Sequence, residues 1–248
     1  MSKESDSDAR PGRHRSNKPV SVKPVALRRV VLKITGESFA PPARLKQVTQ
    51  DIVAAARAGC EVAVVVGGGN IMRGARTDLI ARIPADYAGM VATIVNGMIL
   101  REMLNRRIPT ALLSALPVAG LVPRYDAATA RRELTRGKVV ILSGGTGRPL
   151  FSTDTAAALR ARQLRASAIL KGTKVRGVFS ADPGKNRHAR FYPSLTYRQA
   201  LDQKLQIMDA SAFALCARCR IPIIVFELFQ PGNIRRIVRG EPIGSRVC

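Results

Sequence analysis

The sequence contains no tryptophan, only 4% aromatic residues and two histidines. Acidic residues are also scarce, because 17 Asp and Glu stand against 41 Lys and Arg and give a formal net charge of +24. Few aromatic side chains leave little surface for stacking on nucleic-acid bases. The charge exceeds what a nucleotide pocket requires, so it predicts at most a non-specific, electrostatic attraction for polyanions.

Cysteines and long apolar runs are sparse as well. Cys216 and Cys219 lack the second cysteine pair or the histidines of a zinc site, so we expect reduced thiols and no metal held by the protein. No run approaches the roughly 18 consecutive apolar residues that cross a bilayer. The N-terminus also lacks the apolar segment of a secretory signal. These features predict a cytoplasmic protein with no membrane partner.

The chain divides into two parts by composition. Residues 1–28 are rich in Ser, Pro, Lys and Arg and hold almost no large apolar residue, which predicts a disordered basic tail. Residues 29–248 are predicted to form a single α/β domain, in which apolar strand patterns alternate with helical ones. The expected strands cover 29–34, 61–66, 110–113, 138–142, 168–170 and 221–226, and the expected helices cover 44–58, 85–105, 127–136, 155–163 and 208–218.

Three of the predicted strands end in glycine, at Thr35-Gly36-Glu37, Gly67-Gly68-Gly69-Asn70 and Gly144-Gly145-Thr146-Gly147. One glycine turn after a strand is a routine connection. Three turns at the carboxyl edge of a parallel sheet, where ligands bind, indicate a site whose main-chain N–H groups can approach an anion.

Two cations stand beside these glycine turns. Lys33 ends the first predicted strand and Arg73 follows the second glycine turn, so both suit the oxygens of a phosphoryl group. Alternatively, either residue could be an ordinary surface cation surrounded by water. This alternative is less favoured for Lys33, because a lysine within the apolar run Val-Val-Leu-Lys-Ile is difficult to solvate. The chain has neither a P-loop nor a dinucleotide fingerprint, so the residues alone predict only a phosphate-binding α/β protein.

The glycine segments resemble those of the amino acid kinase superfamily, and within it the bacterial UMP kinases, from Val30 to Val247. The chain reads Lys33-Ile-Thr-Gly-Glu37, then Val66-Gly-Gly-Gly-Asn-Ile-Met-Arg-Gly74, and Thr146-Gly-Arg-Pro-Leu-Phe-Ser-Thr-Asp-Thr155. Aspartokinases and glutamate kinases share the architecture, but the last two segments together are typical of UMP kinases. The resemblance implies a three-layer sandwich with a mostly parallel central sheet flanked by helices. It also implies transfer of the γ-phosphoryl group of ATP to UMP.

The resemblance also implies roles for individual residues. Lys33 and Arg73 would be catalytic, by neutralising charge on the transferred group. Mg²⁺ would be bound through the ATP phosphates. The residues assigned to ATP are Lys33, Ile34, Thr35, Gly36, Gly69, Arg73, Thr173, Phe179 and Asp182, and those assigned to UMP are Gly68, Asp86, Thr146, Gly147, Arg148, Pro149, Leu150, Phe151, Ser152 and Thr153.

Some of these interpretations have open alternatives. Phe179 suits the core as well as the wall of a base pocket. Asp154 and Asp209 precede or begin predicted helices, so helix capping competes with a direct role in the reaction. For the whole chain, the rivals are an amino acid or carbamate kinase, and a catalytically weakened kinase fold that binds nucleotide or associates with RNA.

The sequence departs from the UMP kinase pattern in two ways. Ala40-Pro41-Pro42 follows Phe39 where the family usually has a longer glycine-containing segment associated with GTP regulation, so we expect no activation by GTP. Arg148 and Arg176 stand where small polar or acidic residues are usual, and both add positive charge.

The predicted helix 85–105 is apolar nearly all round, which is too much for a helix with one face in water. We therefore expect a second copy of the chain to cover part of it in a two-fold contact. The resemblance points the same way, with a dimer as the minimum unit and a hexamer as the complete assembly.

Overall fold

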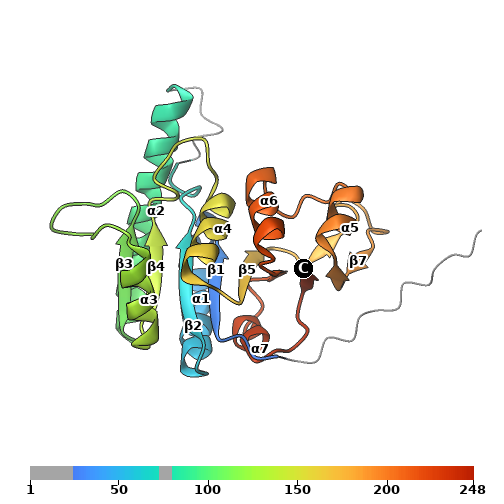
Figure 1. The fold of residues 1–248 in the computed structure, drawn as a ribbon, viewed down its shortest axis with the longest axis horizontal. Coiled ribbons are helices and arrows are strands. Elements are labelled where there is room, and N and C mark those ends of the chain that lie inside the picture. Colours follow the sequence, from blue (N-terminus) through green and yellow to red (C-terminus); the bar gives the residue numbers. More distant parts are fainter. Residues whose placement is uncertain (1–24, 73–79) are drawn as a thin grey trace, which may run out of the picture.

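A computed structural model describes residues 25–72 and 80–248. One central sheet runs through the molecule with helices on both of its faces (Figure 1). The sheet has eight strands in the order β3-β4-β2-β1-β5-β9-β10-β8, and a separate pair, β6 and β7, forms a small antiparallel sheet. The strands are β1 (Arg29–Ile34), β2 (Glu61–Val66), β3 (Thr110–Ser114), β4 (Val139–Ser143), β5 (Ala168–Thr173), β6 (Val178–Phe179), β7 (Phe191–Tyr192), β8 (Ser194–Leu195), β9 (Ile223–Glu227) and β10 (Ser245–Val247).

The strands from β3 to β9 in this order run parallel, and only β10 pairs with β9 in the antiparallel sense. Parallel strands covered on both faces must be apolar on both sides, which explains continuous runs such as the Val62–Val66 part of β2. The predicted three-layer sandwich with a mostly parallel sheet is confirmed.

The helices are divided between the two faces of the sheet. Alternate residues of each strand point to opposite faces, so Val30 and Leu32 pack beneath α1, α2 and α7 while Val31 packs with α3, α4, α5 and α6. The helices are α1 (Pro42–Arg57), α2 (Arg82–Asn105), α3 (Ala127–Thr135), α4 (Thr153–Leu164), α5 (Tyr197–Asp202), α6 (Ala210–Cys219) and α7 (Asn233–Val238), with a 3-10 turn, η1, at Gly36–Phe39.

The described part of the chain begins a few residues before β1, at Val25. The Leu27 N–H donates to the Val238 carbonyl at 2.8 Å, and the Arg28 carbonyl accepts from the Glu61 N–H at 2.8 Å. Leu27 and Arg28 are therefore held against the domain. The rest of the predicted basic tail, residues 1–24, lies outside the described residues.

Within the described part of the chain, α2 alone is long and apolar enough to cross a bilayer by length and composition, and 44% of its apolar window is buried. A core helix of a globular protein passes the same test. Leu100 and Leu104 of α2 are fully buried in the core under the sheet.

Candidate active site

The glycine turns meet at the carboxyl ends of the central parallel strands, as expected for ligand sites in open α/β sheets. Three hollows lie there. A central one of about 250 Å³ is lined by Lys33, the two glycine turns after β1 and β2, and Thr153. One of about 500 Å³ shares Gly68, Gly69 and Thr153 with it. A third, of about 550 Å³, begins at Lys171 on β5 and extends to Asp182.

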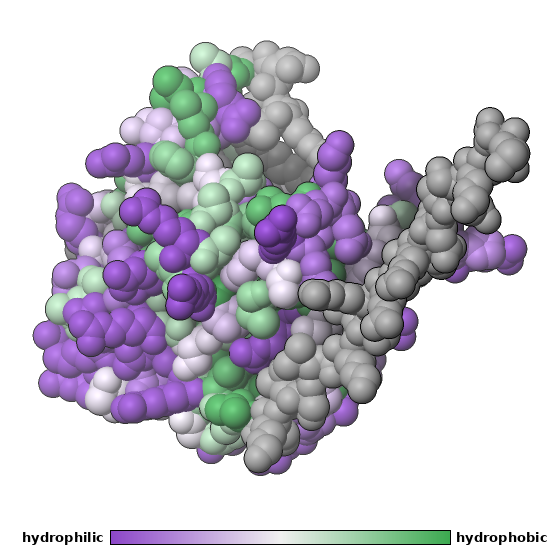
Figure 2. All heavy atoms as spheres, turned by 45° about the vertical axis from the view of Figure 1, so that its right-hand side comes forward, coloured by the Kyte–Doolittle hydropathy of each residue, from purple (hydrophilic) through white to green (hydrophobic). Residues whose placement is uncertain are grey.

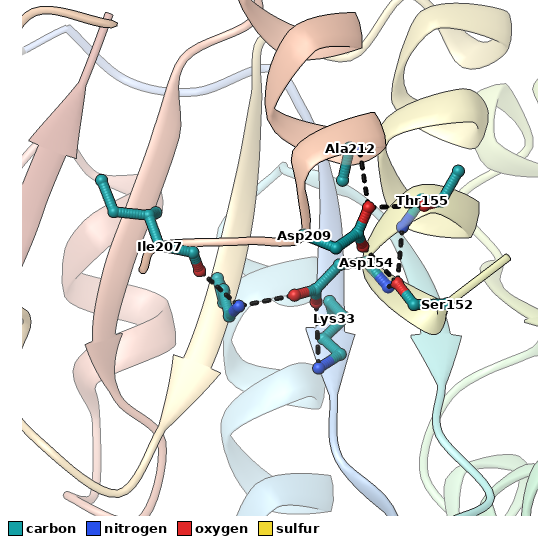
Figure 3. A network of polar contacts seen from close by, with 8 residues as sticks. Lys33, Ser152, Asp154, Thr155, Ile207, Asp209 and Ala212 are labelled. Carbon is teal, nitrogen blue, oxygen red and sulfur yellow. Dashed lines mark hydrogen bonds and ion pairs between the residues drawn. The ribbon is translucent and has the colours of Figure 1, made fainter. Parts of the chain in front are cut away.

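A lysine–aspartate–lysine cluster occupies the middle of this edge (Figure 3). Lys33 and Lys171 are paired residues of the adjacent strands β1 and β5. The Lys33 Nζ lies 3.0 Å from one Asp154 carboxylate oxygen, and the Lys171 Nζ lies 2.6 Å from the other. Only 11 to 15% of each of these side chains is exposed. Two cations therefore share one carboxylate, which leaves a net positive charge at a partly dehydrated position.

Burial and neighbouring opposite charges have opposing effects on the pKa values of Asp154 and Lys171. Burial would raise the pKa of Asp154, but the charges of Lys33 and Lys171 outweigh it, so the pKa lies below the usual 3.8. Burial lowers the pKa of Lys171 from its usual 10.5, and Lys33 lowers it further against the opposing effect of Asp154. The carboxylate is thus ionised at neutral pH.

Asp209 ties the start of α6 to the start of α4. Its carboxylate accepts from the Ala212 N–H at 3.0 Å, which caps α6, and from the Thr155 hydroxyl at 3.0 Å. It also accepts from the Ser152 hydroxyl, whose oxygen in turn caps α4 through the Asp154 and Thr155 N–H groups (Figure 3). Capping is therefore one role of Asp209, whereas Ser152 rather than Asp154 caps α4.

The first two glycine turns fit against each other without room for side chains. A Cβ on Gly36 would lie 2.7 Å from the Gly69 nitrogen, and a Cβ on Gly68 would lie 2.7 Å from the Gly89 carbonyl of α2. The fully buried Asn96 fastens the second turn, because its Nδ2 donates to the Gly67 carbonyl and to the Asn70 side chain, both at 2.7 Å. The backbone N–H groups of these turns are thereby brought close to Lys33.

The segment between β4 and α4 forms one wall of the 500 Å³ hollow. Asp86, on the first turns of α2, accepts the Leu150 N–H at 2.8 Å and pairs with Arg82 at 3.0 Å. Leu150 has a φ of 69°, an unusual value for a leucine. The Thr146 hydroxyl donates to the Arg148 carbonyl at 3.0 Å and closes the turn at Gly147. Asp86 is therefore a backbone anchor for this segment.

The third hollow differs from the other two because an aromatic pair and an arginine lie beside it. The Phe179 ring packs on Phe191 with centroids 5.3 Å apart, and the Arg176 guanidinium lies 4.3 Å from the Phe191 centroid. Phe179 thus belongs to an aromatic pair and also lines the hollow. Thr173 bonds the Phe226 carbonyl at 3.1 Å, and Asp182 accepts the Gly184 N–H at 2.9 Å.

The structure brings most of the predicted residues to one sheet edge in three groups. Seven of the residues assigned to UMP line the 500 Å³ hollow, whereas Thr146, Gly147 and Pro149 do not. Of the residues assigned to ATP, Lys33, Thr35, Gly36 and Gly69 line the central hollow and Thr173, Phe179 and Asp182 line the 550 Å³ one. The side chain of Ile34 is fully buried in the core, so it faces none of the three hollows. Arg73 lies outside the described residues.

Sequence reasoning missed Lys171 and left Asp154 undecided. Lys171 ends an apolar strand run, Ala-Ile-Leu-Lys, in the same way as Lys33 does, and this parallel is the signal that could have found it. A lysine pair flanked by glycine N–H groups can hold the oxygens of a phosphoryl group in transit between the two hollows.

Comparison with known proteins supports this interpretation of the site. Residues 28–227 match the amino acid kinase family. The chain is 41% identical over 232 residues to a uridylate kinase of Vibrio campbellii, a match that covers 90% of this chain and 96% of that protein.

Solved structures are similar over nearly the same span. The UMP kinase of Bacillus anthracis superposes with a TM-score of 0.87 at 32% identity, covering 90% of this chain and 96% of that one. The UMP kinase of Ureaplasma parvum gives 0.84 at 34% identity, covering 89% and 98%. The chain therefore belongs to the amino acid kinase family and, within it, groups with the uridylate kinases.

Proposed function

We propose that this chain transfers the γ-phosphoryl group of ATP to UMP, giving ADP and UDP. The observation that carries the proposal is the Lys33–Asp154–Lys171 cluster between two hollows of nucleotide size at one sheet edge. The relatives at 32 to 41% identity are uridylate or UMP kinases, which supports UMP as the acceptor.

Phosphoryl transfer requires little covalent work from a protein, so positioning and charge neutralisation dominate. The ammonium groups of Lys33 and Lys171 would face the oxygens of the transferred group. Asp154 would orient both lysines, since its two oxygens fix the two nitrogens 3.0 and 2.6 Å away. The backbone N–H groups of the turns at Gly36 and Gly68 would bind the phosphates of the donor and acceptor nucleotides on either side of the transferred group.

The two larger hollows divide between the nucleotides in this proposal. UMP would occupy the 500 Å³ hollow, which is lined by Arg148 and by residues 150–153, with its ribose near Asp86. ATP would occupy the hollow beyond Lys171, with its base beside Phe179 and its phosphates over the central hollow. Arg73, which follows the second glycine turn in the sequence, would add a further cation.

Mg²⁺ is expected with ATP in this family. Among the described residues no group of three or more His, Cys, Asp or Glu side chains could hold a metal ion. The nearest carboxylates are occupied, Asp154 by two lysines and Asp209 by two hydroxyl groups and an N–H. We therefore propose that phosphate oxygens hold the ion and that it offsets their charge.

A coupled assay for ADP release tests the proposal, with UMP, CMP, AMP and carbamate offered as acceptors. UMP should give the highest kcat/KM. Lys33→Ala should lower kcat by roughly 10²- to 10³-fold with a much smaller change in UMP affinity. Lys46→Ala, on the exposed side of α1, is the matched control and should leave kcat unchanged. Preference for another acceptor, or full turnover by Lys33→Ala, would refute the mechanism.

The proposed enzyme is also a homo-oligomer. Five apolar side chains spaced four residues apart along α2 are each 42 to 52% exposed in the single chain: Ile83, Tyr87, Val91, Val95 and Ile99. An apolar stripe of this length on a helix is a typical contact between copies. We infer a two-fold dimer through α2 as the minimum unit and a hexamer as the complete assembly, located in the cytoplasm.

A further inference from the structure

A hollow of about 670 Å³, larger than any at the proposed active site, lies at the opposite edge of the sheet. Its walls are the C-terminal ends of α4 and α6 and the turns that lead from them into β5 and β9. Four arginines line it: Arg162, Arg165, Arg218 and Arg220. The amino ends of the parallel strands lie at the bottom of Figure 1, far from the nucleotide hollows.

These four arginines have no acidic partners in the described part of the chain. No Asp or Glu lines the hollow, and none of the four arginines forms an ion pair with a described carboxylate. Carboxylates elsewhere along this edge are already engaged, Glu61 by Arg29 at 2.5 Å and Glu133 by Lys138 at 2.6 Å. The hollow therefore presents four uncompensated positive charges.

Two of the arginines stand in a backbone conformation that usually takes glycine. Arg165 and Arg220 end α4 and α6 with φ of 55° and 52°, in the left-handed region. A cation at a helix C-terminus gains a little from the helix dipole. The left-handed conformation costs a residue with a Cβ more than that gain. Helix termination alone would thus favour glycine at both positions.

A second arginine-lined hollow, of about 340 Å³, lies at the same sheet edge on the other face. It is formed by the ends of α1 and α7 with the turn after α2, and it contains Arg57, Arg107, Arg235 and Arg239. The hydrogen bond between Leu27 and Val238 places the end of α7 beside the start of β1. The second hollow therefore lies at the same edge of the sheet as the 670 Å³ hollow. Positive hollows therefore flank this edge on both faces.

We propose that the arginine-lined edge docks double-stranded nucleic acid through its phosphates. Cations on both sides of one sheet edge suit the two phosphate rows of a duplex. No aromatic residue is among the described residues that line either hollow, so a single strand would find no stacking platform. This docking is independent of the proposed kinase reaction and accounts for charge that the nucleotide site does not use.

The exposed apolar residues argue against an anionic lipid surface as the occupant. Of the large exposed hydrophobic side chains, none lines either arginine hollow. Membrane-surface proteins combine basic residues with inserted apolar ones.

Figure 2 shows hydrophilic residues gathered toward the lower left of one face, at the end of the molecule that carries the amino ends of the strands in Figure 1.

The test measures fluorescence anisotropy of a labelled DNA duplex of about 20 base pairs, two helical turns, with the full chain at several salt concentrations. The variant is Arg165→Gly with Arg220→Gly, which removes two charges and relieves two left-handed residues. Its affinity should fall on the order of tenfold or more near 0.1 M salt, and the slope of log K against log salt should become shallower by about 2. Its UMP kinase turnover and Tm should not fall.

The control variant is Lys204→Gly with Arg198→Ala. It removes the same charge, and Lys204 is also left-handed, with a φ of 51°, but neither residue lines an arginine hollow. Lys204 lines the proposed ATP hollow, so this variant is a control for DNA affinity and not for turnover. Because salt screens distant charges, it should change affinity by less than about twofold. Equal weakening by both variants, a single strand that binds as tightly as the duplex, or binding to anionic vesicles without binding to the duplex would each overturn the proposal.

Discussion

The Arg160 guanidinium carbon lies over the Tyr125 ring, 3.8 Å from its centroid, although only 5% of Arg160 is exposed. The same guanidinium donates to the Gly145 carbonyl at 3.1 Å and to the Gln163 side chain at 2.9 Å. Gly145 belongs to the third glycine turn, which lines the proposed UMP hollow. Arg160 therefore supports that turn from behind, from a buried position on α4.

Loss of this support should affect both stability and acceptor binding. Arg160→Met should leave the Gly145 carbonyl unpaired, at a cost of about 1 to 3 kcal/mol. For a chain of this size the Tm should fall by roughly 2 to 4 °C per kcal/mol. We expect KM for UMP to rise more than KM for ATP. Tyr125→Phe keeps the ring beside Arg160 and the bond from Arg160 to the Gly145 carbonyl but loses the hydroxyl that binds Gln163, so its effect should be smaller. Calorimetry and initial rates measure both effects, and equal effects of the two variants would contradict this account.

Asp154 should stabilise the fold in a pH-dependent way. Its pKa is lowered in the folded chain, so its stabilisation is present above the unfolded value near 3.8 and is lost as pH falls through the lower folded value. Asp154→Asn leaves two mostly buried lysines without a counter-charge, which costs about 3 to 5 kcal/mol near neutral pH. Its Tm should lie below that of the parent at pH 7, and the two Tm values should converge in acid. A constant Tm difference across this range would count against the ion-pair cluster.

Lys171 should set the alkaline limit of activity. Its pKa lies below 10.5 chiefly because it is buried, so the proposed phosphate-binding charge is lost at a lower pH than for an exposed lysine. The same shift makes the charged Lys171 a cost to stability, which decreases as pH rises above the folded pKa and is gone once pH passes the unfolded value near 10.5. Lys171→Arg, which stays charged, should move the alkaline fall in kcat to higher pH. An unchanged pH profile would remove Lys171 from the reaction.

The sheet could be predicted from sequence because its strands are buried on both faces. Runs such as Val62–Val66 can pack only between two layers of helices, and the glycine turns after them mark the carboxyl edge. The predicted strand 29–34 and strand 61–66 agree with β1 and β2. Short elements were missed, including α7, β8 and β10. A helix of six residues has fewer than two turns, and strands of two or three residues are too short to form an apolar run.

The candidate site was less predictable than the fold because its geometry depends on pairing between distant segments. Lys33 was found because a lysine is unusual in an apolar strand, but its partner Asp154 comes from the second position of α4. Only the register of β1 with β5 places Lys171 beside Lys33. Asp86 was assigned to ribose, and in the structure its carboxylate holds the Leu150 N–H, a contact that no sequence pattern encodes.

The Asp86–Leu150 contact leads to a prediction about UMP binding. Asp86→Ala frees the Leu150 backbone, whose φ of 69° is unfavourable for leucine, so residues 146–151 should lose their fixed conformation. KM for UMP should rise on the order of tenfold, equivalent to about 1.4 kcal/mol, while KM for ATP changes little. Leu150→Gly added to Asp86→Ala tests the ribose contact, because glycine accepts this φ. If the double variant regains normal UMP affinity, Asp86 acts only as a backbone anchor.

Assembly provides the last prediction. Val95 lies in the middle of the apolar stripe on α2 and is 43% exposed in the single chain. In a monomer, Val95→Glu would place a carboxylate in water and change stability by about 0.5 kcal/mol or less. In a two-fold contact it would bring two carboxylates together in an apolar interface, which costs several kcal/mol. Light scattering after size exclusion should therefore show the parent as a dimer or larger and Val95→Glu as a smaller species. Val118→Glu, at another exposed valine off the stripe, is the matched control and should keep the parent's mass. A parent of monomer mass would show that there is no such contact. A Val95→Glu variant that keeps the parent's oligomeric mass would show that the contact does not involve this part of α2.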